Sequence, residues 1–108
     1  MTTSLPQRFE QFHHDNPAVY QHYVKLAREW RDSGRQRCGI GMLTEVLRWN
    51  TALARGNGDI RLPHQFRAYY ARLIMHENPE LEGLFILRSS AADEWIAQRA
   101  AMPDTRDR

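Results

Sequence analysis

The residues that could carry out chemistry begin with a histidine pair, His13-His14, followed directly by Asp15. Neighbouring residues on a helix point about 100° apart, so these two imidazoles would not converge on one ion. The glycine-marked stretch 56–58 lacks the Lys-Ser/Thr of a phosphate-binding loop. The spacing of these residues therefore predicts no metal site and no cofactor.

Cys38 is the one cysteine, and it follows Arg37, whose positive charge could lower the pKa of the thiol. Because the sequence places no base beside it, we expect Cys38 to be a small packing residue rather than a nucleophile. The sequence thus predicts no catalytic residue and no enzyme. A single cysteine also excludes an intramolecular disulfide and is compatible with a reducing compartment.

Length and composition are those of one folded unit: 108 residues, of which 42% are hydrophobic and 26% charged. We expect a single domain over residues 1–108, with a core from about 5 to 101 and a frayed tail over 102–108. The first residues show no charged-then-apolar signal pattern, and nowhere do 18 apolar residues run together. These features predict a cytoplasmic protein without membrane contact.

The charged residues are unevenly distributed along the chain. Residues 28–72 contain nine arginines against four carboxylates, whereas residues 73–108 contain four arginines against seven carboxylates. The planar guanidinium suits phosphates and guanine edges, although a G+C-rich genome would also favour arginine codons. The basic middle of the chain therefore points to a nucleic acid, and the acidic end points to a protein partner.

Two helices are predicted in the first third of the chain. Ser4 and Gln7 fit a capping box for the first helix, which Asn16-Pro17 ends, because the residue before a proline avoids the helical region. The same Asn16 would cap a second helix that runs to about Ser33, with Gly34 as its stop.

The middle of the chain predicts a helix over 42–54 with apolar residues around much of its circumference, so we expect this helix to be central. We expect the tryptophans at 30, 49 and 95 to pack in the core. A turn over 55–59 and a short strand over 60–62 follow, and Pro63 begins a fourth helix that ends at about Glu77. The apolar run 84–87 has the length of a buried strand, and Ser90 would cap a last helix over 91–101.

This order of elements is that of a winged helix. We expect a mainly α fold, a winged-helix-like domain with a small β-sheet of two or three short strands and extra N- and C-terminal helices. Pairing of residues 59–62 with 84–88 would form the sheet. If these segments do not pair, the fold becomes a plain helical bundle.

In a winged helix, the helix over 63–77 would enter the major groove of DNA. It carries a small residue flanked by amide and guanidinium side chains, the groups that read base edges. Other arginines could bind the phosphate backbone. The same side chains could instead form an ordinary solvated face. The predicted DNA-binding residues are His64, Gln65, Arg67, Ala68, Arg72, Arg35, Arg37 and Arg61.

A scattered pattern runs through roughly residues 9–88: Phe9-x-x-Phe12-His13, Asn16-Pro17-x-Val19, Gly39-Ile40, Glu45-Val46-Leu47-Arg48-Trp49, Tyr70-Ala71-Arg72-Leu73-Ile74-Met75, Pro79-Glu80-Leu81 and Gly83-x-Phe85. This pattern resembles a family of small phage and prophage proteins, mostly without an assigned activity. The resemblance implies a phage context, and with it either a DNA-binding regulator or an inhibitor of a host defence system.

Two functions follow from the sequence. The first is a small phage-type DNA-binding protein, a transcriptional or genome-associated regulator that binds double-stranded DNA through the helix over 63–77. The alternative is a non-enzymatic protein-interaction module that inhibits a host defence protein or nuclease. Its surface would be the acidic stretch 77–82, which could imitate phosphates, or an exposed aromatic patch. A homodimer is compatible with either function.

Overall fold

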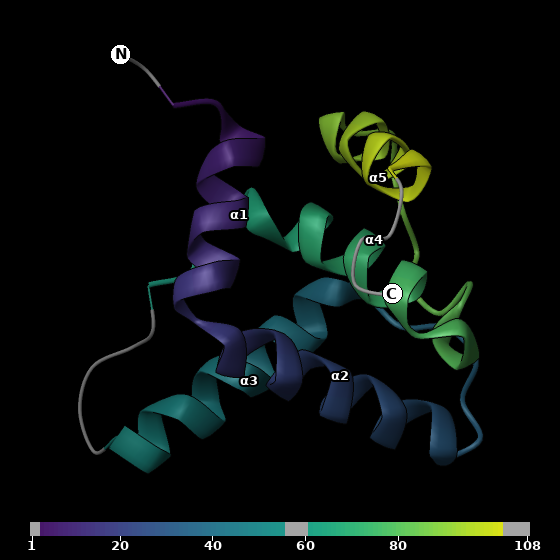
Figure 1. Ribbon diagram of the computed structural model, residues 1–108. Coiled ribbons are helices and arrows are strands. Elements are labelled where there is room, and N and C mark those ends of the chain that lie inside the picture. The colour runs from purple at the N-terminus through teal and green to yellow at the C-terminus, as the bar shows by residue number, and fades with distance from the viewer. Residues whose placement is uncertain (1–2, 56–60, 103–108) are drawn as a thin grey trace, which may run out of the picture.

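The computed structural model describes residues 3–55 and 61–102, apart from the side chain of Arg55, and shows a mainly helical protein (Figure 1). Its described elements are α1 (Leu5–Asp15), α2 (Pro17–Asp32), α3 (Ile40–Arg55), α4 (Phe66–Glu77), the short 3-10 helix η1 (Pro79–Leu81) and α5 (Ala91–Ala101). Within these residues, no helix combines the length and the apolar character needed to cross a membrane.

The helix boundaries follow local chemistry that the sequence predicted. Ser4 and Gln7 form the capping box of α1, and Ser90 and Asp93 form that of α5. Asn16 separates α1 from α2 as predicted, but its side chain caps the other helix: the amide nitrogen donates to the carbonyl of Phe12 at the end of α1. Gly34 ends α2 with φ at 93°, a conformation that favours glycine.

The small sheet is not confirmed. Within the described residues the extended segments make one isolated parallel bridge, between Cys38 and Phe85, and no strand. Its backbone hydrogen bonds run from Cys38 N to the carbonyl of Leu84 and from Ile86 N to the carbonyl of Cys38. Of the predicted partner strand, residues 59 and 60 lie outside the described residues, and residues 61 and 62 are not in a strand. The turn over 55–59 lies almost entirely outside them too.

The central helix is α4, so the prediction that the helix over 42–54 is central is wrong. In Figure 1, α4 crosses the middle of the molecule, and it packs against α1, α2, α3, α5 and η1. It begins at Phe66, three residues later than predicted. Its buried residues lie all around its axis, as is typical of a helix without a solvent face: Phe66, Tyr69, Tyr70, Ala71, Arg72, Leu73 and Ile74.

Aromatic rings fill the space between α4, α1 and α5. Phe9 of α1 is fully buried and contacts four rings from α4 and α5, with centroid distances between 4.8 and 5.5 Å. Edge-to-face and offset arrangements of this kind add to the free energy that area burial supplies. The four rings from α4 and α5 are those of Phe66, Tyr69, Tyr70 and Trp95.

One charged side chain is buried in this interior. Arg72 is 4% exposed, and its guanidinium lies 2.6 Å from a carboxylate oxygen of Asp93 in α5. It also donates to the carbonyl oxygens of Ala68, at 2.9 Å, and Arg88, at 2.7 Å. The hydrogen bond from Arg72 holds the pKa of Asp93 below its usual value of 3.8. Arg72 thus ties α4 to the start of α5 and to the segment before it.

We expect Arg72→Met to lower the free energy of unfolding by about 2–3 kcal/mol, because the substitution removes the guanidinium that donates to the carboxylate of Asp93 and to the carbonyl oxygen of Arg88. Urea unfolding followed by circular dichroism would measure this. Arg61→Met, at an exposed position, is the matched control and should leave the stability nearly unchanged. Equal stability of the two variants would contradict the structural role of Arg72.

Candidate functional surfaces

Four of the eight residues predicted to bind DNA line one open groove of about 610 Å³: His64, Arg67, Ala68 and Arg72. We call it the basic groove. Three helices begin at its walls. Its lining includes residues 39–41 around the start of α3, residues between 64 and 68 around the start of α4, and Ser89 and Ser90, which precede α5. Helix starts carry partial positive charge, and the groove adds a further arginine, Arg88.

The arginines and the histidine of the basic groove differ in how exposed they are. Arg88 and His64 are exposed, while the side chain of Arg67 is one-quarter exposed and lies 3.6 Å from the carboxylate of Glu45. Arg72 already makes its three contacts inside the protein. An anion in this groove would therefore meet mainly Arg67, Arg88 and His64, because the side chain of Arg72 is only 4% exposed.

The other four predicted residues do not line the basic groove. Gln65 and Arg61 are exposed and lie close in sequence to the groove residue His64. Arg37 is exposed on the connector between α2 and α3. Arg35 lies over the ring of Trp30, 5.0 Å from its centroid, and lines a separate pocket that also contains glutamates 80 and 82. The structure therefore divides the predicted cations between surfaces of different charge.

The outer side of α3 carries a row of large apolar side chains that the described part of the protein leaves uncovered. Met42 is 42% exposed, Val46 39%, Trp49 67% and Leu53 66%. Their spacing of four, three and four residues places all of them on one side of the helix. We call this row the α3 apolar face.

The opposite side of α3 fixes the direction of this face. Leu43, Thr44 and Leu47 are buried. Thr44 donates to the carbonyl of Ile40, and its hydroxyl oxygen lies 2.7 Å from the hydroxyl of Tyr23 in α2, which therefore donates. Burial raises the pKa of Tyr23 to about 12, so this donor keeps its proton. α3 cannot rotate its apolar face inward without breaking this buried bond.

The prediction that Trp49 packs in the core is wrong, and together with the expected central position of this helix it concealed the α3 apolar face. Apolar residues around most of a helix indicate burial on all sides, but α3 packs against α2 and α4 only on its inner side. In Figure 1 its last turns extend to the lower left, away from α5. The separate row at 42, 46, 49 and 53 was the pattern that could have revealed a second contact surface.

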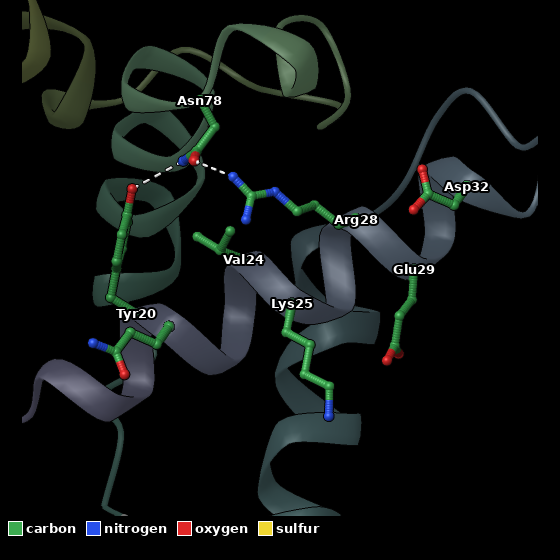
Figure 2. Close-up of a pocket in the computed structure, with 8 residues that line it drawn as sticks. Tyr20, Val24, Lys25, Arg28, Glu29, Asp32 and Asn78 are labelled. Carbon is green, nitrogen blue, oxygen red and sulfur yellow. Dashed lines mark hydrogen bonds between the residues drawn. The ribbon is translucent and has the colours of Figure 1, made fainter.

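A third hollow lies along α2 and holds about 480 Å³ (Figure 2). Three of its polar side chains are linked by hydrogen bonds: Arg28 donates to Asn78, and Asn78 donates to the hydroxyl of Tyr20. Arg28 also donates to Glu80 at 2.8 Å. Figure 2 shows Lys25 pointing away from this network. These contacts fasten α2 to the end of α4 and to η1, so the hollow is a structural junction.

The acidic stretch 77–82 is partly neutralised by arginines from other helices. Glu80 pairs with Arg28 of α2 at 2.8 Å, and Glu77 lies 3.6 Å from Arg99 of α5. Glu82 is exposed. A surface that imitates phosphates needs clustered unpaired carboxylates, so these contacts weaken the acidic stretch as a candidate partner site.

Cys38 forms the bridge with Phe85, and its side chain is buried. Burial raises the pKa of its thiol, which is opposite to the lowering that a neighbouring Arg37 could have caused. His13 stacks on Phe9, and burial lowers the pKa of its imidazole. Among the described residues, no three His, Cys, Asp or Glu side chains gather closely enough to hold a metal ion. The surroundings of Cys38 and His13 are therefore those of packing residues.

No protein-family model matches the chain, and neither the search of curated proteins nor the search of solved structures found a match. The resemblance to small phage and prophage proteins thus stays a prediction. Support for a function therefore comes from the surfaces of the molecule.

Replacing an exposed residue of the α3 apolar face should barely change stability. We expect Trp49→Gln to change the free energy of unfolding of dilute protein by no more than about 0.5 kcal/mol. Leu47→Ala, on the buried side of the same helix, should lower it by about 2–5 kcal/mol. Chemical denaturation of both variants gives the comparison, and a large loss in Trp49→Gln would show that Trp49 belongs to the core.

Proposed function

We propose that this protein is a non-enzymatic protein-interaction module that associates through the α3 apolar face. The observation that carries the proposal is the row of four large apolar side chains, two of them two-thirds exposed, on one side of one helix. Single exposed apolar residues are ordinary on a monomer, but a contiguous row of them is typical of a contact surface.

The geometry of the row favours a helix as the partner element. Residues that recur every three to four positions form the seam at which one helix packs against another, as in coiled coils. The seam includes a tryptophan, a residue that often supplies much of the binding energy in protein interfaces. Burying Trp49 and Leu53 would remove the largest exposed apolar side chains of α3 from water.

The proposed partner belongs to one of two classes. A host protein, such as a nuclease or another defence protein, is the partner that the phage resemblance implies, and it would be met in the host cytoplasm. A second copy of this chain is the other class. Both would use the same face, so one experiment on that face tests the proposed function irrespective of the class.

A photo-crosslinking aromatic amino acid in place of Trp49 tests the proposal in the cells that produce the protein. We expect one covalent adduct of defined mass, because a docked helix holds the same partner atoms against this position. The same amino acid in place of Gln21, an exposed residue on α2, is the matched control. The proposal fails if positions 49 and 21 give the same diffuse adducts.

Binding of double-stranded DNA is the second candidate, and the basic groove is the observation that favours it. Three helix starts and the exposed side chains of Arg88 and His64 surround a hollow that also reaches Arg67. Phosphate oxygens are bound in this way at helix starts. In the winged-helix version of this proposal, residues 84–88 would act as the wing beside the first turn of α4.

Binding of a duplex over a series of salt concentrations tests this second candidate. If Arg67 and Arg88 each contact a phosphate, replacing both with alanine should make the slope of log affinity against log salt shallower by about 1.8. Arg35→Ala, in the mixed-charge pocket, is the control and should keep more of the original slope. Unchanged slopes in all variants would exclude the groove as the DNA contact.

A further inference from the structure

We propose that the occupant of the α3 apolar face is a second copy of this chain, with the two α3 helices antiparallel about a two-fold axis. This inference rests on the proposed function and specifies its partner. It is carried by the spacing and sizes of the four exposed side chains and by the charges beside them.

The spacing of the row reads the same in both directions. Met42, Val46, Trp49 and Leu53 are separated by four, three and four residues. An antiparallel copy therefore sets Met42 against Leu53 and Val46 against Trp49, and all four side chains meet an apolar partner. A two-fold axis then passes between positions 47 and 48, and one self-complementary patch serves both copies.

Side-chain size distinguishes the antiparallel pair from the parallel one. In the antiparallel register the largest side chain, Trp49, lies opposite the smallest, Val46, so the two helices can keep an even separation. In the parallel register Trp49 would meet Trp49 and Val46 would meet Val46, which pushes the helices apart at one level and leaves a gap at the next. Close packing without gaps favours the antiparallel arrangement.

The charges near the face do not oppose this pairing. Glu45 and Arg48 flank the row and lie 3.6 Å apart on the same helix, so the border of the face carries both signs. The chain as a whole has a net charge of only +2, which gives little repulsion between copies. Antiparallel α3 helices also set each helix start beside the end of the other, which opposes their dipoles favourably.

The size of the face indicates a dimer that dissociates on dilution. Scaled by their exposed fractions, the four side chains together offer roughly 400 Å², about half of what one partner gives in a standard interface. The border residues add to this area. We therefore expect a dimer at high protein concentration and a monomer at low concentration.

Charge variants of the full chain test both the partner and the register. Met42→Glu and Leu53→Lys should each abolish the dimer in sedimentation velocity, because each sets a charge against an apolar side chain. Both positions are exposed, so circular dichroism melts should confirm an intact fold. An equimolar mixture of the two variants should restore the dimer, since the antiparallel register sets the carboxylate introduced at position 42 of one copy against the ammonium group introduced at position 53 of the other.

A mixture of Met42→Glu with Met42→Lys is the matched control, and it should remain monomeric because these positions meet only in a parallel pair. Rescue in this control instead would overturn the antiparallel register. A wild-type chain that stays monomeric at every concentration would overturn self-association. If the crosslinker at position 49 then still gives a defined adduct with another protein, the proposed function stands; if it gives none, both are wrong.

Discussion

The burial of α4 on every side determines which residues are left for a partner. Because α4 packs against all the other described helices, a charge on it must be satisfied inside the protein, and Arg72 meets this requirement through Asp93 and two carbonyl oxygens. A guanidinium held in this way orients α5 against α4, and with 4% of its side chain exposed it offers a phosphate little surface. What remains accessible of the predicted recognition helix is its first turn, at the wall of the basic groove, and its last residues, His76 and Glu77.

The same constraint places α3 at the edge. With the centre of the molecule occupied by α4, the inner side of α3 is covered by α2 and α4, and the described residues provide no further element for its outer side. The hydroxyl pair of Tyr23 and Thr44 then fixes the rotation of α3, so that Trp49 and Leu53 face outward. The exposed row is thus a consequence of how the interior is filled, and it lies on a helix that is held firmly on its other side.

Local chemistry allowed the helices to be predicted, and long-range packing explains where prediction failed. Capping boxes at Ser4 and Ser90 and the proline after Asn16 act within a few residues, so they can be read from the sequence. Which of two apolar helices lies at the centre depends on contacts between distant segments, and α3 carries apolar residues around most of its circumference, as a central helix does. The apolar neighbours of Arg72 made a partly buried ion pair conceivable, but its partner Asp93 is 21 residues away and could not be identified from the sequence. Arg67 and His64 were correctly placed together, because they lie one turn apart.

The two surfaces meet at the start of α3, and their geometry separates the two functional proposals. Residues 39–41 line the basic groove, while Met42 begins the α3 apolar face. In an antiparallel pair, position 40 of one copy lies opposite position 55 of the other. At 1.5 Å per residue, the starts of the two α3 helices are therefore about 22 Å apart along the helix axis. Two half-sites on DNA lie about 34 Å apart along the same face of the duplex. The separation of the two basic grooves also depends on how far each groove lies from the α3 axis, because α4 and residues 86–90 form most of its lining. Finding the α3 dimer would therefore argue for association through α3 without arguing for recognition of DNA.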